Sequence, residues 1–572
     1  MGKTKPAHDV EKEHLMATIP VIQQSREYPP TDISCWKYFI RNTAQYGDYT
    51  IFSHAGRDHS RSEFIADVEA LAAFFHRELG LREQDVFTIF MPTNAESIIT
   101  FMALNKIGVI VNFVHPLLPP ENVEELLDFT DSKGIMLLDL FAPKYAPMLK
   151  KLNLPVVLCS PKEYALPDKT VCPIDETALR ALSTGDVKVY EYPTVLSRYA
   201  GQHVNSVPEG RRFVAVYMNG GGTTGRSRTI KLSNYALNSV IYGLGAVNVP
   251  VRKIGYDTEL CAMPFFHAFG LCAGGLNALN KGARSIFLPK FDPDQFISLI
   301  KQYHVTEFNG VPNMYKKLVE HPDFDMPELQ SISVMYSGGD FVSPQLLERI
   351  YAVMRKNGSK AEFCAGYGLT ECGAVCSANR LWANKPGTIG QPIQGLRFEI
   401  WDDNNQPLPC GEVGQIVITG ASMMEGYLTR SGPADAGIYR DEFGTRWILT
   451  GDLGKMDEDG YVTFIGRKKR VIIISGYNVY PVDIEQLVET LPYVRECCAV
   501  QGFQGDRPIV RLFVVKNEDS DEEACRAEIT ALISDNLSKF SVPKEIRYID
   551  EIPRTRLQKV DFMALSQFTP EN

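Results

Sequence analysis

Apolar and polar positions alternate along the first half of the chain in a way that predicts helices interleaved with short strands. Residues 61–79 carry their apolar side chains at helical spacing, whereas residues 86–90 form the short apolar run of a buried strand. The elements expected next are a helix over 94–107, a strand over 109–113, a helix over 120–129 and a strand over 135–138. Such alternation is typical of an α/β fold with parallel βαβ sheets covered by helices on both faces.

The pattern changes after about residue 390. Strands over 398–401 and 414–419 flank an Asp/Asn-rich turn, and strands and glycines dominate up to residue 465, which predicts a small β-rich subdomain. A charged tether follows, and beyond it residues 471–572 show strands and helices of their own. We therefore predict a polar N-terminal extension (1–30), a large domain (31–465), a tether (466–470) and a small α+β C-terminal domain (471–572).

Composition narrows the function classes. The chain has 572 residues, 44% of them hydrophobic, and a formal net charge of -10, which argues against general nucleic-acid binding. No apolar run is long enough for a membrane span, and the N-terminal residues lack the apolar stretch of a signal peptide. The 12 cysteines show no paired C-x-x-C spacing, so we expect reduced thiols and a cytoplasmic location.

The glycine-rich segment 219–228 (NGGGTTGRSR) is the strongest single signal for chemistry. It follows a strand-like run over 213–218, and its glycines, threonine hydroxyls and arginines are suited to cradling phosphates. A dinucleotide fingerprint is excluded, because no Asp or Glu occurs between Arg226 and Tyr256 to hold a ribose. A P-loop is excluded too, because Arg226 stands in place of Lys and a strand-like run follows, with Ser233 or Asn234 as the N-cap of the next helix. The sequence therefore predicts a phosphate-binding loop between two strands, and we call this segment (219–228) the clasp.

Seven motifs in order resemble those of the acyl-adenylate-forming ligases, which include acyl-CoA synthetases, nonribosomal-peptide adenylation domains and firefly luciferase. The resemblance covers about residues 35–565 and is closest to the fatty-acyl-CoA synthetases. The motifs are GGGTTG at 220–225, PFFH at 264–267, YSGG at 336–339, GYGLTE at 366–371, TGDL at 450–453, GRKK at 466–469 with SGYNVYP at 475–481, and PRT at 553–555 leading to Lys559.

The resemblance implies ATP-dependent activation of a carboxylic acid to acyl-AMP, with transfer of the acyl group to a thiol. ATP, Mg²⁺ and CoA would be the cofactors, with Glu371 and Thr224 as metal ligands. The catalytic residues implied are Lys559, His267, Thr370 and Arg228. The implied ATP and AMP contacts are Gly220, Gly221, Gly222, Thr223, Thr224, Gly225, Gly338, Gly339, Asp340, Gly366, Tyr367, Gly368, Asp452 and Arg467.

The same resemblance implies an acyl pocket and a moving C-terminal domain. Lys469 corresponds to the hinge, and Ser475, Gly476 and Tyr477 to the tunnel for the pantetheine arm of CoA. The implied pocket residues are Phe266, His267, Phe269, Asn309, Gly310, Gly338, Ala365, Gly366 and Gly373. The segment around His267 offers aromatics but no Asp to pair with an amino acid's ammonium group, so we expect a fatty or aryl acid.

Three positions depart from the family pattern, and three functions stay open. Ser227 and Arg228 replace the usual Pro and Lys of the clasp, and Gln558 replaces the glycine before Lys559. The positive charge of the clasp survives, and Arg can hold phosphate bidentately. The alternatives are a CoA ligase, a ligase that loads the phosphopantetheine of a separate carrier protein, and a non-catalytic acyl-nucleotide-binding descendant.

Overall fold

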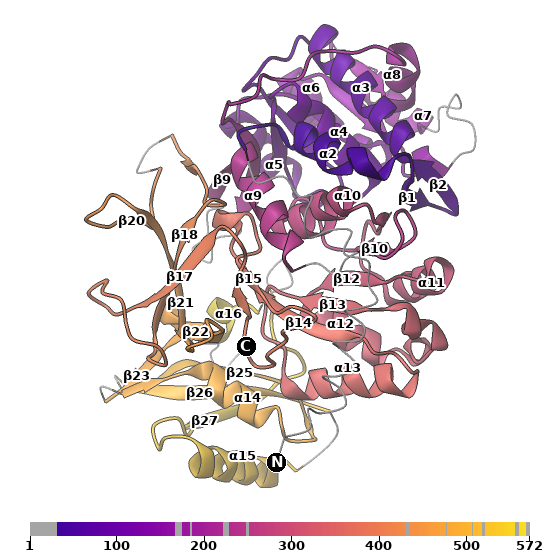
Figure 1. The fold of residues 1–572 in the computed structure, drawn as a ribbon. Helices are drawn as coiled ribbons and strands as arrows, with labels where there is room; N and C mark the ends of the chain where they lie inside the picture. The colour runs from indigo at the N-terminus through magenta and orange to yellow at the C-terminus, as the bar shows by residue number, and fades with distance from the viewer. Residues whose placement is uncertain are drawn as a thin grey trace, which may run out of the picture.

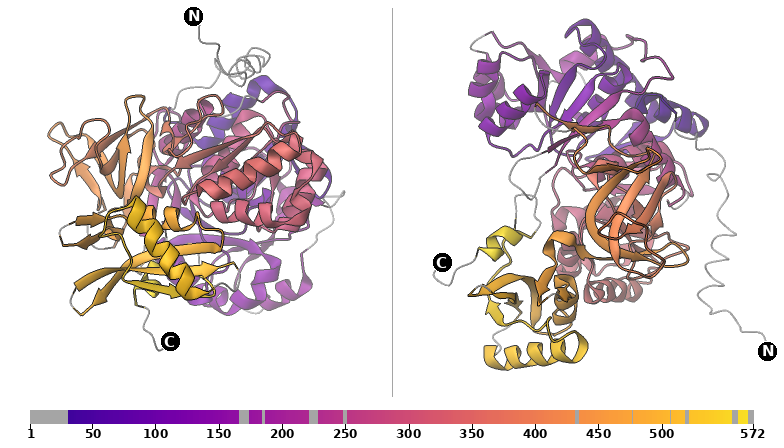
Figure 2. Two further views of the ribbon diagram at one scale, coloured as in Figure 1. Left: turned by 90° about the horizontal axis from the view of Figure 1, so that it is seen from below. Right: turned by 90° about the vertical axis from the view of Figure 1, so that its left-hand side faces the viewer.

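The computed structural model describes most of the chain. The described ranges are 31–165, 174–183, 186–220, 228–247, 251–430, 434–475, 477–505, 507–517, 521–554 and 560–567. Figure 1 shows an N-terminal tier, a central tier, a β-rich unit beside it and a C-terminal unit below. The right-hand view of Figure 2 also shows the C-terminal unit set below the rest of the chain.

The first large sheet belongs to the N-terminal tier and has eight strands. Its inner strands run parallel, and the two strands at one edge, β9 and β19, are antiparallel to their neighbours. In spatial order the strands are β19 (Gly426–Leu428), β9 (Arg228–Ser233), β8 (Val214–Gly220), β4 (Ile110–Phe113), β3 (Val86–Phe90), β5 (Ser132–Leu138), β6 (Val156–Cys159) and β7 (Val189–Glu191).

The second large sheet forms the central tier and has nine strands. It is parallel from β14 to β1, with antiparallel strands at both edges. In spatial order the strands are β16 (Gln391–Pro392), β15 (Ser377–Ala378), β14 (Glu362–Tyr367), β13 (Val334–Ser337), β12 (Glu307–Gly310), β10 (Thr258–Cys261), β11 (Arg284–Phe287), β1 (Thr50–His54) and β2 (Arg57–Ser60).

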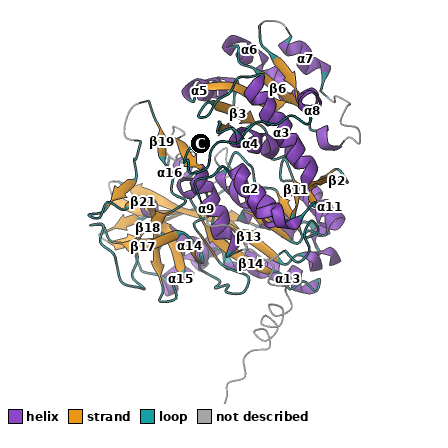
Figure 3. Ribbon diagram, turned by 45° about the horizontal axis from the view of Figure 1, so that its top comes forward, coloured by secondary structure: helices purple, strands orange, loops and turns teal. Residues whose placement is uncertain are grey.

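Helices cover both large sheets, as Figure 3 shows by secondary structure. One core runs between the two tiers and includes buried residues from α2, α3, α4 and α9. The helices of this part are α2 (Cys35–Thr43), α3 (Arg61–Arg77), α4 (Ala95–Lys106), α5 (Pro120–Phe129), α6 (Ala142–Leu152), α7 (Glu176–Leu182), α8 (Tyr192–Tyr199), α9 (Asn234–Gly245), α10 (Asn277–Lys281), α11 (Pro293–Tyr303), α12 (Pro312–Glu320) and α13 (Pro344–Lys356). The predicted α/β fold is confirmed, with antiparallel edge strands added to the parallel sheets.

Local signals explain several helix starts. Ser60 and Glu63 form a reciprocal capping box at the start of α3, and Asn94 caps α4. At α9 the N-cap is Ser233, whose hydroxyl accepts from the Ala236 N–H at 3.2 Å, so Asn234 becomes the first helical residue. The helix over 61–79 and the strand over 86–90 lie where the sequence predicts them, within two residues at each end.

The β-rich unit is a five-stranded antiparallel sheet. Its strands are β17 (Leu396–Trp401), β18 (Gly414–Gly420), β21 (Arg446–Met456) and β20 (Ile438–Arg440), with β22 (Val462–Arg467) also paired to β21. The Asp/Asn-rich turn joins β17 to β18, as its composition predicts: the Asp402 carboxylate accepts from the N–H groups of Asn404 and Gln406, both at 2.8 Å.

The C-terminal unit has its own core. It contains the hairpin β23 (Ile472–Ile474) and β24 (Tyr477–Val479), the sheet β25 (Val494–Gln504), β26 (Arg507–Lys516) and β27 (Glu545–Tyr548), and the helices α14 (Pro481–Val488), α15 (Glu522–Asn536) and α16 (Phe562–Ser566). The Lys316 ammonium of α12 donates to the Arg495 carbonyl at 3.2 Å, which joins this unit to the central tier. In the described part of the chain, no helix combines the length and apolar character that a membrane crossing requires.

Candidate functional site: a pocket at the ends of parallel strands

A pocket of ≈ 150 Å³ lies over the second sheet, beneath α9 and the π-helical segment η4 (Gly270–Leu276). Its glycine end consists of Gly338, Gly339, Gly366, Tyr367 and Gly368, together with Leu369 and Thr370. Its opposite end, here called the floor, consists of Val247, Asn277, Glu307 and Asn309. The other lining residues are Leu244, His267, Phe269, Ala273, Tyr336, Ser337, Ala374, Val375 and Ala378.

The glycine end forms where neighbouring parallel strands stop together. In register, Gly310 of β12 lies beside Ser337 of β13, which lies beside Ala365 of β14. Gly338 therefore comes directly after the end of one strand, and Gly366 lies level with it on the next. Carboxyl ends of parallel strands are the usual location of ligand sites in open α/β sheets, because the loops that follow them diverge there.

The glycines of the site have different structural reasons. A Cβ on Gly368 would lie 1.3 Å from the Ala374 carbonyl oxygen, and one on Gly373 (φ +70°) would lie 2.7 Å from Val240 Cγ2. Gly339 has φ +84°, a conformation that side chains disfavour. A Cβ on Gly338, in contrast, would meet nothing nearer than 3.7 Å. The fold itself therefore requires glycine at three of these positions but leaves space at Gly338, on the pocket wall.

Tyr367 and Asp452 are brought together across two sheets. The Tyr367 hydroxyl donates to Asp452 Oδ2 at 2.6 Å, and Arg467 Nε lies 3.3 Å from Asp452 Oδ1. Arg467 is the cross-strand neighbour of Asp452 in the β21–β22 pair. Burial and the Asp452 carboxylate raise the pKa of Tyr367 well above its usual value, so the hydroxyl stays protonated and donates. Asp452 is fully buried behind Tyr367, and a ribose would reach it only by displacing one of these partners.

Glu371 is held by a tyrosine that the sequence motifs do not single out. The Tyr427 hydroxyl donates to Glu371 Oε1 at 2.9 Å, and the Arg228 guanidinium lies 5.2 Å from the centre of the Tyr427 ring. Burial, followed by the charge of Glu371, raises the pKa of Tyr427 to about 12. Tyr427 lies in β19, which pairs with the clasp strand β9, so this contact links the clasp to the segment after β14.

His267 and Phe269 enter the pocket from the turn before η4. The His267 N–H donates to the Pro264 carbonyl at 3.0 Å, and a Cβ on Gly270 would lie 2.1 Å from that same oxygen. Gly270 therefore allows the chain to pass close to itself and aims the aromatic pair at the pocket. π-Helical turns are rare and often occur at functional sites, and this one contributes Ala273 to the pocket wall.

Several residues expected in the acyl pocket lie outside its lining. Side chains alternate along β12, so Glu307 and Asn309 face the pocket, while a Cβ on Gly310 would lie 2.9 Å from the Tyr315 ring on the opposite side. Phe266 packs on His115 with ring centres 4.4 Å apart. Ala365 and Gly373 are also absent from the lining, and the exposed Asp340 directs its carboxylate to the N–H of Phe341 at 2.9 Å.

Part of the predicted site falls on undescribed positions. These are Gly221, Gly222, Thr223, Thr224 and Gly225 of the clasp, with Ser227, and also Gly476, Gln558 and Lys559. The two strands that flank the clasp, β8 and β9, form an antiparallel pair in which Gly220 lies opposite Arg228. The clasp thus connects two strands rather than a strand and a helix, as its sequence predicts.

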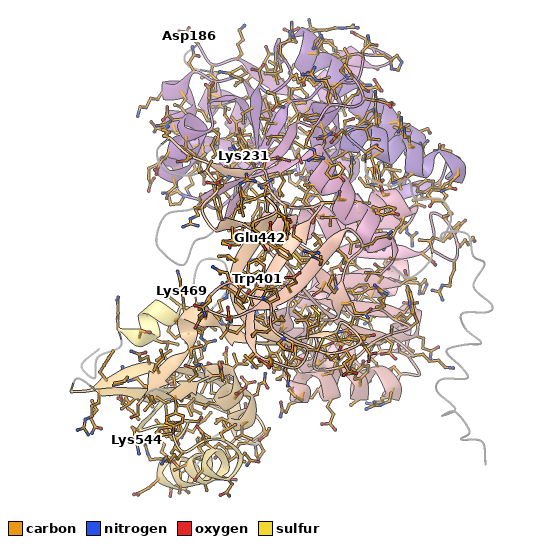
Figure 4. The ribbon with its side chains drawn as sticks, turned by 60° about the vertical axis from the view of Figure 1, so that its left-hand side comes forward. Asp186, Lys231, Trp401, Glu442, Lys469 and Lys544 are labelled. Carbon is orange, nitrogen blue, oxygen red and sulfur yellow. The ribbon has the colours of Figure 1, made fainter. Side chains whose placement is uncertain are left out.

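The predicted hinge lies at the boundary of the C-terminal unit. Figure 4 places Lys469 where the β-rich unit passes into the C-terminal unit. Lys469 is exposed and belongs to η8 (Lys468–Arg470), a single helical turn. In the hairpin that follows, Ser475 has φ +52°, and Tyr477 is 58% exposed and stacks on Phe540 of its own unit. Ser475 and Tyr477 are both exposed to solvent.

Comparison with known proteins identifies the family. Residues 39–428 match the model of the AMP-binding enzyme, and residues 483–559 match its C-terminal domain. The chain belongs to the AMP-binding enzyme family. This AMP-binding enzyme is 28% identical over 546 residues to a long-chain-fatty-acid–CoA ligase of Bacillus subtilis, with 93% of the chain and 94% of the relative covered. It is 25% identical to 4-coumarate–CoA ligase 1 of Arabidopsis thaliana, with 93% and 92% covered. The prediction of an enzyme of the acid–thiol ligase type is confirmed.

Solved structures share the fold of this AMP-binding enzyme. ATP-bound MatB from Rhodopseudomonas palustris superposes with a TM-score of 0.75 at 22% identity, covering 94% of this chain and 99% of that one. A benzoate CoA ligase from Burkholderia xenovorans gives a TM-score of 0.77 at 20% identity, covering 93% and 100%.

Proposed function

We propose that this enzyme activates a carboxylic acid with ATP, forming acyl-AMP and pyrophosphate, and then transfers the acyl group to the thiol of CoA. The observation that carries the proposal is the single pocket in which the glycine end and the pair His267 and Phe269 meet. One compartment thus joins a wall suited to a nucleotide and a cavity suited to an acyl group.

The first half-reaction needs two anions to meet. The substrate carboxylate attacks the α-phosphorus of ATP, and the bond to the pyrophosphate oxygen breaks. Gly338 gives the adenosine close access to the backbone, the Tyr367 ring offers a stacking face, and Asp452 accepts from the ribose hydroxyls once one of its present partners moves. Arg228 and the clasp hold the β- and γ-phosphates, and Lys559 bridges the carboxylate and the α-phosphate.

Mg²⁺ fits the residues present. It prefers oxygen ligands and is usually bound by one or two carboxylates together with substrate phosphates. The Glu371 carboxylate, oriented by Tyr427, would supply that protein ligand, and Thr224 is the second ligand that the sequence predicts. The ion would neutralise phosphate charge.

The second half-reaction is thioester formation. The CoA thiolate attacks the acyl-AMP carbonyl, and AMP leaves with the electron pair of the acyl–oxygen bond. We propose that the C-terminal domain (471–572) turns at Lys469 between the two steps, bringing the Ser475–Tyr477 region over the pocket in place of Lys559. The solvent-facing hairpin and the exposed hinge support this motion.

ATP–pyrophosphate exchange over a panel of aryl and fatty acids tests the proposal, with CoA added afterwards to detect thioester. We expect exchange with at least one acid and a thioester with CoA. Absence of exchange with every acid would favour a non-catalytic nucleotide-binding protein. Exchange without a CoA thioester, but with acylation of a carrier protein's phosphopantetheine, would show that the acyl acceptor is a carrier protein and not CoA.

A further inference from the structure

The floor of the pocket lies deep below the glycine end. Glu307 pairs with Val334 of β13, four residues before Gly338. At ~3.3 Å per residue along a strand, Glu307 is about 13 Å deeper in the pocket than Gly338. An acyl group whose carboxylate lies near Gly338 and His267 therefore points its far end at Glu307. This depth suits an aryl or medium-length acyl group.

A buried ion cluster stands behind this floor. Lys281 of α10 lies 2.7 Å from Glu259 Oε2 and 2.6 Å from Glu307 Oε1. All three side chains are less than a tenth exposed. Burial alone would lower the pKa of Lys281, but attraction to the two carboxylates raises it above its usual value, so the ammonium persists. Burial raises the pKa of Glu259, since its charged form loses water.

The cluster also borders a second, much smaller hollow. It has a volume of ≈ 10 Å³ and is lined in part by Glu259, Lys281 and Glu307, which leaves room for about one water molecule. Asn309 Nδ2 donates to Glu259 Oε1 at 2.8 Å, so both oxygens of Glu259 have partners. Glu307 accepts from Lys281 through Oε1, and its Oε2 has no partner among the described residues. Of the three side chains, Glu307 is the one that lines the pocket, and its Oε2 is the acceptor that the ion pair with Lys281 leaves over.

A plain hydrocarbon end is a poor occupant of this floor. It would remove water from a carboxylate and two amides, of Asn277 and Asn309, without replacing the lost hydrogen bonds. A group that donates a hydrogen bond restores them. Sites built to bind a substrate hydroxyl or amine reject the analogue that lacks it far more strongly than apolar pockets reject a missing methylene.

We propose that the acid activated by this enzyme carries a hydrogen-bond donor, a hydroxyl or an amine, at the end far from its carboxylate, and that Glu307 receives it. The inference rests on the proposed function and narrows its substrate class. It separates this chain's acid from unsubstituted long-chain fatty acids.

Matched acyl-sulfamoyl adenosines, stable mimics of acyl-AMP, test the floor without turnover. Three mimics derive from one arylpropenoic acid with hydroxyl, amino or hydrogen at the para position, and a further pair compares an ω-hydroxylated with an unsubstituted medium-chain acid. Calorimetry on the wild-type enzyme should show at least one donor-bearing mimic binding at least tenfold more tightly than its unsubstituted partner. The hydroxyl and amino compounds decide between the two donors.

Variants localise the effect. Glu307→Gln should reduce the tenfold preference to less than threefold, whereas Glu96→Gln, a buried carboxyl in α4 outside the pocket lining, should preserve it. If Glu307→Gln does not fold, the binding of donor-bearing and unsubstituted mimics to the wild-type enzyme tests the inference by itself. Equal or tighter binding of the unsubstituted mimics overturns the inference, and exchange with the unsubstituted acids then still supports acid activation. Failure of exchange with every acid contradicts the proposed function itself.

Discussion

The glycine end of the pocket is made of loops at strand ends, whereas the floor is made of side chains from within strands and helices. At the glycine end, Gly368 and Gly339 hold backbone shapes that few other residues could adopt. At the floor, Glu307 and Asn309 occupy ordinary strand positions, and only the pleat of β12 directs them into the pocket. The two ends therefore constrain sequence in different ways.

This difference separates chemistry from selectivity. Contiguous motifs build the glycine end, so under the proposed function we expect a change there to alter nucleotide binding for every acid. Single side chains from separate elements build the floor, so under the proposed function we expect a change there to alter which acid fits without altering nucleotide binding. The four predictions below test this division, from the largest expected effect to the smallest.

Lys559→Ala should lower the rate of acyl-AMP formation at least 100-fold, since a positioned charge on the reacting phosphate is lost. Thioester formation from supplied acyl-AMP should continue at near the wild-type rate. Single-turnover assays of each half-reaction measure this. Lys544→Ala, in the same domain, is the control and should leave both rates unchanged. Equal loss of both steps in Lys559→Ala would contradict the domain rotation.

Tyr367→Phe should raise the KM for ATP about tenfold and affect all acids alike. The variant keeps the ring but removes the hydroxyl that donates to Asp452 Oδ2 and orients this buried carboxylate for the ribose, a loss of about 1–3 kcal/mol. Tyr461→Phe is the control, because that hydroxyl donates to the Ala383 carbonyl at 2.9 Å and neither residue lines the pocket. Steady-state kinetics with two different acids measure the effect. If the kinetic constants changed with only one of the two acids, Tyr367 would act on acid selection, as the floor residues are expected to do.

Gly338→Ala should raise the KM for ATP severalfold while leaving the melting temperature unchanged, because the added Cβ meets only ordinary contacts at 3.7 Å in the protein. Gly368→Ala should instead lower the melting temperature or prevent folding, since its Cβ would lie 1.3 Å from a carbonyl oxygen. Thermal unfolding and ATP titration separate the two. Similar melting losses in both variants would show that Gly338 is structural as well.

Glu96→Gln should change stability and leave selectivity alone. Burial raises the pKa of Glu96 to about 8, above the value of about 4.3 in an unfolded chain. The folded state therefore binds the proton more tightly, and the free energy of unfolding falls as the pH rises from about 4.3 to 8. The variant should melt a few degrees higher than wild type at pH 9 and equally at pH 4. Glu320→Gln, about half exposed, should show no such difference. If the melting temperatures of Glu96→Gln and wild type change with pH in the same way, the raised pKa of Glu96 is contradicted.

Sequence alone determined the elements and the order of the motifs. Periodicity places α3, β3 and α5, because burial on one helical face or in a parallel strand leaves a pattern that needs no knowledge of the partner. Glycines, turn residues and charged groups adjacent in the chain identify the clasp and the GYGLTE segment, because phosphate and nucleoside contacts use adjacent backbone groups.

Only the tertiary structure decided which side chains share the pocket. Glu307, Lys281 and Glu259 lie 22 to 48 residues apart in the chain and become a cluster because β10, β12 and α10 pack together. Tyr427 holds Glu371 because β19 adds to the edge of a sheet whose other strands come from the N-terminal half. Gly310 follows Asn309 directly in β12, so a Cβ on it would point to the opposite face of the strand, toward Tyr315 and away from the pocket. Contacts of this kind depend on register and packing between distant segments, which leave no mark in any local stretch of sequence.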